Sequence, residues 1–156
     1  MQLNFPVYEF DIVKEAGQPK IYDMIRRKYM VLTPEEWVRQ HLIKFLVQDK
    51  NFPASLIAVE RQVMINGLSK RFDLLVFDHQ GLAFLLAELK SPDIKLTQDV
   101  LEQIANYNSR FSAPYLFVSN GLTHVLYLLN KDMQKYEALP EMKSWEELLQ
   151  LSRGVW

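Results

Sequence analysis

Residues 71–90 read RFDLLVFDHQGLAFLLAELK, which is two apolar runs separated by a short polar segment. The runs have the length and composition of buried strands, and His79-Gln80-Gly81 between them is typical of a hairpin turn. Asp73 lies inside the first run, and Glu88 and Lys90 close the second. Charged groups in buried strands are costly unless they are paired or bound to a metal. This stretch therefore predicts a strand pair that carries a cluster of ionisable groups at one end.

The alternation of side chains along a strand indicates what the cluster could do. Glu88 and Lys90 are two residues apart and point to the same face, whereas Leu89 points into the opposite layer. Converging carboxylates of Asp73 and Glu88 would repel each other, and a hard cation such as Mg²⁺ (or Mn²⁺) would remove that repulsion because it prefers oxygen ligands. Lys90 could then activate water or stabilise developing negative charge. The pattern favours a divalent-cation site over its alternative, a structural ion cluster at the sheet edge.

The composition predicts an ordinary globular domain. The chain has 156 residues, of which 49% are hydrophobic and 24% charged, as in soluble proteins with one sizeable core. It contains no cysteine, which excludes disulfides and cysteine-ligated zinc and fits a cytoplasmic location. No apolar run approaches the roughly 18 residues of a membrane span, and the first residues do not resemble a secretory signal. The histidines lack metal-ligand spacing.

The charge balance bears on the choice of partner. The formal net charge is −1 at pH 7, whereas nucleic-acid binders usually carry a basic excess. Bound cations would offset part of the negative charge at the predicted site. Positive charge is concentrated locally at Arg26-Arg27-Lys28 and at Lys70-Arg71, which are either solvated surface or phosphate contacts.

The order of predicted elements indicates an α/β fold. Thr33-Pro34-Glu35-Glu36 predicts a helix start, because Thr33 can cap, proline suits the first helical position and Glu36 completes a capping box. We expect this helix to end near Val47. It is followed by strands over 56–65, 70–77 and 83–89, a helix over 98–111 capped by Thr97, strands over 115–118 and 124–129, and a last helix over 144–151. Asn66-Gly67 is the expected turn of the first hairpin.

We expect one domain over residues 1–156. Its N-terminal arm covers residues 1–30, with short β-like pieces at 5–10 and 20–24 around a Gly17-Gln18-Pro19 turn. The core spans about residues 31–130, and a C-terminal helix follows.

The combination of motifs resembles the PD-(D/E)XK nuclease superfamily. The shared pattern is Asp73, fourteen residues, and then Glu88-Leu89-Lys90, with Phe72 at the place where a proline often precedes the aspartate. More narrowly, residues 30 to 130 are similar to the N-terminal nuclease domain of type I restriction enzyme R subunits. The segments that carry this similarity are residues 34–40, 71–73, 87–92, 103–107 and 119–121. The resemblance implies a restriction-endonuclease-like core, a central mixed sheet flanked by helices.

The resemblance also implies site residues. Asp73, Glu88 and Lys90 would be catalytic, and the metal would be held by Asp73, Glu88 and the backbone carbonyl of Leu89. A glutamate of the first helix would assist. At 100° per residue, Glu35 lies about 60° and Glu36 about 160° from the apolar position Val38, so Glu35 is favoured.

A second group of residues has both a functional and an ordinary interpretation. Gln103 and Tyr107 share one helical face, and the resemblance places them beside the site as substrate-binding residues. Otherwise they are a surface glutamine and a half-buried tyrosine. Arg39 is either a surface charge or an ion-pair partner of Glu35.

The remaining candidates have structural explanations. Ser119-Asn120-Gly121 is expected to form a turn, although the family has a similar tripeptide near the site. His41 is expected to pack in the core. Trp145 and Trp156 are expected to contribute to packing or to an interface.

Together these features predict a Mg²⁺-dependent endonuclease that hydrolyses DNA phosphodiester bonds, in a restriction or repair system. The expected partners are DNA and a separate helicase motor or other subunit. Two alternatives stay open: a non-catalytic module that binds nucleic acid or a protein on the same fold, and a subunit that is active only with its partner.

Overall fold

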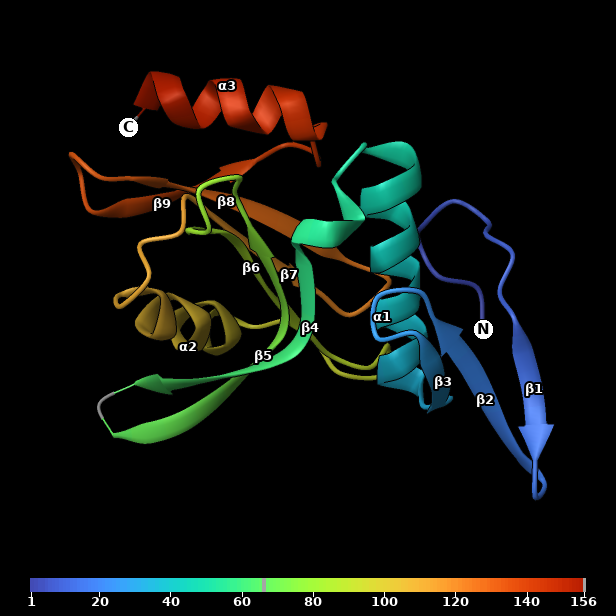
Figure 1. Cartoon of the computed structure of the whole chain (residues 1–156). Helices are drawn as coiled ribbons and strands as arrows, with labels where there is room; N and C mark the ends of the chain where they lie inside the picture. Colours follow the sequence, from blue (N-terminus) through green and yellow to red (C-terminus); the bar gives the residue numbers. More distant parts are fainter. Residues whose placement is uncertain (66, 156) are drawn as a thin grey trace.

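The computed structural model describes residues 1–65 and 67–155, and within them a six-stranded sheet forms the centre of the molecule (Figure 1). The strand order follows the chain, β4-β5-β6-β7-β8-β9. The strands are β4 (Ile57–Ile65), β5 (Leu68–Phe77), β6 (Ala83–Leu89), β7 (Tyr115–Ser119), β8 (His124–Asn130) and β9 (Lys135–Leu139). Strands β6 and β7 are parallel and the other neighbours are antiparallel, so the predicted mixed sheet is confirmed. The predicted turn residue Asn66 lies outside the described residues.

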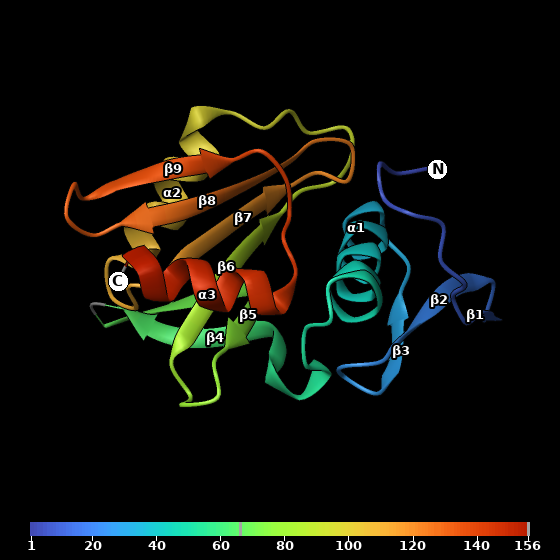
Figure 2. The ribbon, with the colours of Figure 1, turned by 90° about the horizontal axis from the view of Figure 1, so that it is seen from above.

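Helices cover both faces of this sheet. Helices α1 (Pro34–Lys44) and α3 (Trp145–Val155) pack on one face, where Val38, Leu42 and Leu148 share a core with alternate residues of β5 and β6. Helix α2 (Gln98–Asn108) covers the other face, where Ile104 packs with Leu86 and Leu116. The flanked α/β architecture is the one expected from the sequence (Figure 2).

The helix boundaries differ from those expected. Thr33 caps α1 as predicted, since its hydroxyl accepts from the Glu36 N–H, but the α-helix ends at Lys44 and continues as a π-helical turn, Phe45–Asp49. Helix α2 ends at Asn108 because that side chain turns back to bind both backbone groups of Ala113. Thr97 occupies its N-cap position without a side-chain cap hydrogen bond.

The N-terminal residues form a separate three-stranded antiparallel sheet instead of a loose arm. Its strands are β1 (Ile12–Glu15), β2 (Gln18–Asp23) and β3 (Lys28–Val31), and Gly17, with φ +78°, makes the first turn. Residues 5–10 are not a strand. Phe5 and Phe10 instead stack around His41, which is a buried core histidine as expected. Helix α1 lies between this sheet and the central sheet (Figure 2).

The C-terminal part contains one strand more than predicted, β9, and α3 extends beyond residue 151. Trp145 packs against Phe52 and Phe84, in line with the predicted packing role, whereas Trp156 lies outside the described residues. In the described part of the chain, helices with the length and apolarity to cross a bilayer are absent.

Candidate active site

Asp73 and Glu88 lie side by side on neighbouring strands. The antiparallel register pairs Leu74 of β5 with Ala87 of β6, so Asp73 and Glu88 are the next residues on the two strands. The Leu89 N–H donates to Asp73 Oδ2 at 2.8 Å, which fixes the carboxylate against the end of β6. The strand pair thus brings together two of the predicted site residues.

A local distortion of β5 turns the Asp73 side chain toward helix α1. Phe72 and Leu75 both pack in the α2-side core although they are three residues apart, so the normal two-residue alternation breaks between them. The ladder with β4 pairs Val59 with Leu74 and then Arg61 with Phe72, and Glu60, opposite Asp73, has φ +51°. A non-glycine residue in this left-handed region is uncommon and marks strain. The distortion explains how Asp73 leaves an apolar strand and reaches polar partners.

Glu88 and Lys90 form the second half of the site. Lys90 Nζ lies 3.4 Å from Glu88 Oε1, and the Lys90 N–H donates to the Ser119 carbonyl at 2.9 Å, which anchors the end of β6 to β7. Burial and the nearby charge of Asp73 raise the pKa of Glu88 to about 7, against the opposing effect of Lys90. Such a shift is characteristic of clustered carboxylates in functional sites.

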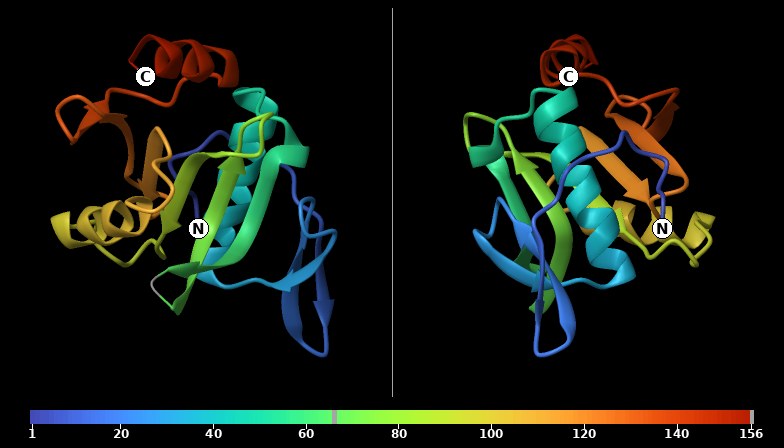
Figure 3. Two further views of the ribbon diagram at one scale, coloured as in Figure 1. Left: turned by 60° about the vertical axis from the view of Figure 1, so that its left-hand side comes forward. Right: turned by 90° about the vertical axis from the view of Figure 1, so that its right-hand side faces the viewer.

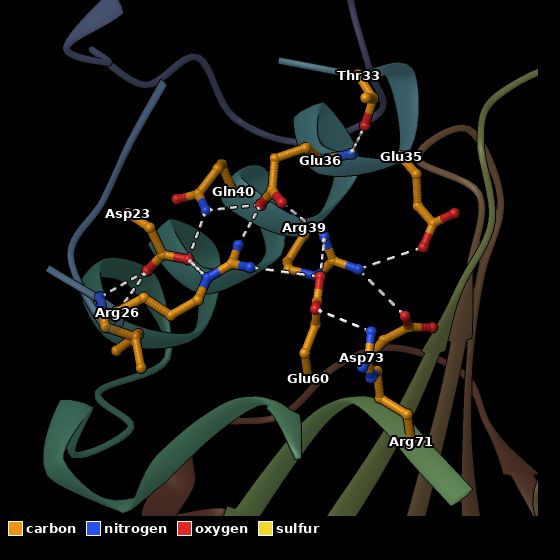
Figure 4. Close-up of polar contacts among 11 residues, drawn as sticks. Asp23, Arg26, Thr33, Glu35, Glu36, Arg39, Gln40, Glu60, Arg71 and Asp73 are labelled. Atoms are coloured by element: carbon orange, nitrogen blue, oxygen red, sulfur yellow. Dashed lines mark hydrogen bonds and ion pairs between the residues drawn. The ribbon is translucent and has the colours of Figure 1, made fainter. Parts of the chain in front are cut away.

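Glu35 lies near Asp73 on the adjoining helix α1, and its assisting role stays a prediction. Arg39 Nη2 lies 3.2 Å from Glu35 Oε1 and 3.1 Å from Asp73 Oδ1, so one guanidinium nitrogen bridges the two acids (Figure 4). Burial and the charge of Asp73 raise the pKa of Glu35, although its side chain is 45% exposed. Arg39 is therefore the predicted ion-pair partner of Glu35, but it is buried and not a surface charge.

Glu36 is not the solvent-facing capping residue that the sequence suggested. It is 4% exposed, and its carboxylate accepts from Arg26, Arg39 and Gln40. The Thr33 N–H donates to the Val31 carbonyl and not to the Glu36 side chain. The second hydrogen bond of the predicted capping box is therefore not formed, and that part of the prediction is wrong. Glu36 is buried because the N-terminal sheet covers the face of α1 that would otherwise be exposed to water.

Arg26 links that sheet to the site, and sequence reasoning missed it. Its guanidinium contacts Asp23 at 2.6 Å, Glu36 at 2.7 Å and Glu60 at 3.3 Å, and Glu60 in turn lies 3.7 Å from Arg39 (Figure 4). The cluster Arg26-Arg27-Lys28 was expected to be either solvated surface or phosphate contacts, yet the side chain of its first member is buried against acidic residues. The available signal was Asp23, an acid three residues before Arg26 that interrupts the apolar residues 21–24 of a β-like segment.

Gln103 and Tyr107 lie on α2 close to the site strands. Gln103 Nε2 donates to the Tyr107 hydroxyl at 3.2 Å, and the Tyr107 ring packs against Phe72, the residue before Asp73. Lys70 Nζ lies 5.2 Å from the centre of the Tyr107 ring. The pair thus borders β5, and its role toward a substrate stays a prediction.

Ser119-Asn120-Gly121 forms the expected turn, but it is buried. Asn120 Oδ1 accepts from two following N–H groups, and its Nδ2 donates to the Ile94 carbonyl at 2.7 Å. Gly121 has φ +87° and sits against Leu3 and Val38, where a Cβ would approach side-chain carbons at 2.9 and 3.0 Å. The tripeptide therefore fixes the loop after Lys90 as well as the end of β7.

The donor chemistry at this site suits a hard divalent cation only in part. Asp73, Glu88 and the Leu89 backbone would supply oxygen ligands, and burial together with the charge of Asp73 raises the pKa of Glu88. However, among residues 1–65 and 67–155, no three His, Cys, Asp or Glu side chains converge as a metal-binding group. Arg39 supplies part of the positive charge that a cation would bring.

Comparisons with known proteins agree with this architecture. The family described as type I restriction enzyme R protein N terminus matches residues 34–142. A fragment of a candidate HsdR subunit of a type I restriction enzyme from Vibrio vulnificus YJ016 has a TM-score of 0.56 at 16% identity, and the match covers 80% of this chain. The chain spans only 26% of that fragment, and the likeness at this identity concerns the fold alone.

A candidate nuclease belonging to DUF820 from Anabaena variabilis ATCC 29413 is a weaker structural match, with a TM-score of 0.45 and 14% identity over 83% of this chain and 80% of that one. A search of curated proteins gives no match.

Proposed function

Because the chain belongs to the family of type I restriction enzyme R protein N termini, we propose that it is a metal-dependent deoxyribonuclease domain that hydrolyses DNA phosphodiester bonds. The proposed catalytic residues are Asp73, Glu88, Lys90 and Glu35. The proposed partners are DNA and the other subunits of a restriction or repair assembly, including a helicase motor.

One observation carries this proposal. A lysine and two carboxylates meet where the end of β6 lies beside the middle of β5, and burial together with the charge of Asp73 raises the pKa of Glu88 to about 7. A fold that needed only stability would gain little from this arrangement, because burying like charges together costs free energy. Sites of chemistry are where such costs are commonly found.

The residues divide into those that hold the cation and those that act on substrate. Asp73, Glu88 and the Leu89 carbonyl would bind Mg²⁺ or Mn²⁺, with Glu35 assisting. When bound, the cation lowers the pKa of water and neutralises charge on the phosphate. Lys90 places a positive charge beside Glu88, where it stabilises the negative charge that develops on the phosphate oxygens during attack.

The other residues of the site position these groups or the substrate. The N–H of Leu89 and the guanidinium of Arg39 orient the two oxygens of Asp73. Gln103 and Tyr107, which are already hydrogen-bonded to each other on α2, would contact the nucleic acid next to β5.

The second candidate function is a non-catalytic nucleic-acid- or partner-binding module on the same fold. The observation that favours it is the ion pair between Arg39 and Asp73, because a built-in cation can stabilise this carboxylate without a metal. In that case Lys90 would contribute binding energy but no chemistry.

Cleavage of labelled single- and double-stranded DNA in Mg²⁺ or Mn²⁺ separates the two functions. Asp73→Asn is the preferred variant, because asparagine keeps the size of the side chain and one oxygen that can accept from Arg39 or from the Leu89 N–H, while removing the charge. Asp132→Asn, in the exposed turn between β8 and β9, is the matched control. A nuclease loses cleavage in the first variant and keeps it in the second, whereas DNA binding without cleavage in the wild type supports the binding module.

A further inference from the structure

The β-hairpin that leads into the site carries only positive charge beyond Glu60. We name the two strand segments of residues 61–65 and 67–72 the basic ribbon. Between residues 61 and 72 the sequence contains Arg61, Lys70 and Arg71 and no aspartate or glutamate. The chain as a whole has a net charge of −1, so the basic ribbon is a local concentration of cations on a nearly neutral protein.

The cations lie on both faces of the basic ribbon. The register pairs Gln62 with Arg71 and Arg61 with Phe72, so Arg71 and Arg61 point to opposite faces. Lys70 shares the Arg61 face and lies over the Tyr107 ring. Negatively charged groups of a ligand would therefore find a cation on either face of the ribbon.

Arg71 retains positive charge that is available to a ligand. It lies 3.5 Å from Glu60, but this carboxylate also contacts Arg26 and Arg39, so one negative charge is shared among three guanidinium groups. The Arg71 side chain is 59% exposed, in contrast to 13% for Arg26 and 5% for Arg39. Of the three arginines, Arg71 is the one that solvent and ligands can reach.

Two exposed apolar side chains lie near the free end of the basic ribbon. Met64 is 68% and Leu68 is 61% exposed, although both belong to strands. In Figure 1 the ribbon runs out below α2 on the side away from α1, and Figure 3 (left) shows it projecting beyond the neighbouring strands of the central sheet. This end thus combines an apolar tip with basic flanks, and it lies away from the core.

The position of the basic ribbon connects it to the chemistry. Arg71 is two residues before Asp73 on the same strand, a separation of about 7 Å at the usual rise per residue. A phosphate chain held by Arg71 would consequently run beside the candidate active site. Gln103 and Tyr107 border the same strand from α2.

We propose that the basic ribbon binds duplex DNA by entering its major groove. The inference rests on the proposed function and adds the surface that holds the substrate. A two-stranded ribbon fits the major groove, which is about 12 Å wide, and the phosphates along both groove walls would meet the cations on its two faces. Met64 and Leu68 lie on opposite faces near the free end of the ribbon, so they would lie deepest in the groove, where apolar side chains can contact thymine methyl groups.

The test is DNA binding in the absence of divalent cation, measured by fluorescence anisotropy over a range of KCl concentrations with labelled duplex and single-stranded oligonucleotides. Arg61→Gln/Arg71→Gln is compared with Arg27→Gln/Lys28→Gln, which removes the same charge from two exposed residues at the start of β3. Glu60 keeps Arg26 and Arg39 as partners in the first variant. Thermal melting verifies that both variants are folded.

The proposal predicts that the wild type prefers duplex DNA and that the ribbon variant binds it at least about tenfold more weakly. A plot of log K against log[salt] has a negative slope, and its magnitude should decrease by about two in this variant, because each replaced arginine no longer neutralises a phosphate. The control should keep the wild-type slope. Met64→Ala/Leu68→Ala should weaken duplex binding without changing the slope.

Equal losses of affinity in the two double variants would overturn the basic ribbon as the DNA surface while leaving the proposed function intact. Equal or tighter binding of single strands by the wild type would overturn the groove assignment. A wild-type chain that neither binds nor cleaves DNA would instead remove the proposed function, and this inference with it.

Discussion

Arg39 and Asp73 form an ion pair of 3.1 Å between a buried helix residue and the strand residue at the centre of the candidate site. The same guanidinium contacts Glu35, Glu36 and, at 3.7 Å, Glu60, so one side chain of helix α1 contacts four carboxylates. Its Nε is buried without a hydrogen-bond partner among the described residues, so all its polar contacts are made through Nη1 and Nη2. The geometry of Asp73 therefore depends on Arg39.

Replacing Arg39 by methionine should destabilise the fold strongly. Glu36 and Asp73 would lose a buried counter-ion, and removal of one partner from a buried ion pair typically costs about 3–5 kcal/mol. Arg39→Lys should cost less, because it keeps the charge but cannot bridge the acids with two nitrogens. Urea denaturation of the two variants and the wild type measures this, and equal stability of all three would contradict the proposed role of Arg39.

Glu88 should make the metal-free protein less stable as the pH rises. Its pKa of about 7 lies above the ordinary value of 4.5, so between these values the folded state binds more protons than the unfolded state. The contribution of Glu88 to the unfolding free energy is therefore greatest below about pH 4.5. It decreases toward pH 7, by no more than about 3 kcal/mol.

Glu88→Gln should remove this component. The difference in unfolding free energy between variant and wild type, measured from pH 4.5 to 8 in EDTA, should grow in favour of the variant as the pH rises. A difference that is constant over this range would show that Glu88 does not titrate as described.

Glu35 and Glu36 should affect different properties. Glu36 is buried among Arg26, Arg39 and Gln40, so Glu36→Gln should lower the unfolding free energy by about 2–4 kcal/mol. Glu35 is half-exposed, and Glu35→Gln should change stability by less than about 1 kcal/mol but reduce cleavage. Melting and cleavage assays on both variants test this division, and the reverse pattern would assign the assisting role to Glu36.

Tyr107→Phe should reduce cleavage moderately, by roughly 3- to 10-fold, with little change in stability. Phenylalanine keeps the packing on Phe72 but loses the hydrogen bond from Gln103, an interaction of about 1 kcal/mol. Gln103→Ala should have a similar effect, and the double variant should be little worse than either single one. Fully additive losses in cleavage rate would show that the two residues act separately.

The central part of the fold could be predicted because its signals are local. Residues 57–89 form three strands from long apolar runs with polar turns, and Thr33-Pro34 marks the start of α1. The positions of Asp73, Glu88 and Lys90 followed from the same strands. Strand β9 was missed because it is a largely exposed edge strand, whose residues Lys135–Leu139 lack an apolar run.

The electrostatic network could not be predicted, because it depends on tertiary contacts. The helical positions of Glu35 and Glu36 were computed relative to one apolar face, but α1 has a second covered face, against the N-terminal sheet. The distortion at Glu60 and Asp73 likewise leaves no local signal in the sequence. The spacing of Glu35 and Arg39 allowed their ion pair to be predicted, but the contact of Arg39 with Asp73 and the part played by Arg26 became recognisable only when residues distant in sequence were brought together.

Lys90→Ala tests the central claim most directly, when DNA cleavage and metal binding are measured on the same protein. Lys90 is proposed to act on the substrate and not to hold the cation, so the variant should keep the rise in melting temperature caused by Mn²⁺ or Mg²⁺ and lose DNA cleavage at least about 100-fold. Asp73→Asn should lose both properties. Cleavage that persists at the wild-type rate in both variants would contradict a nuclease site at Asp73, Glu88 and Lys90.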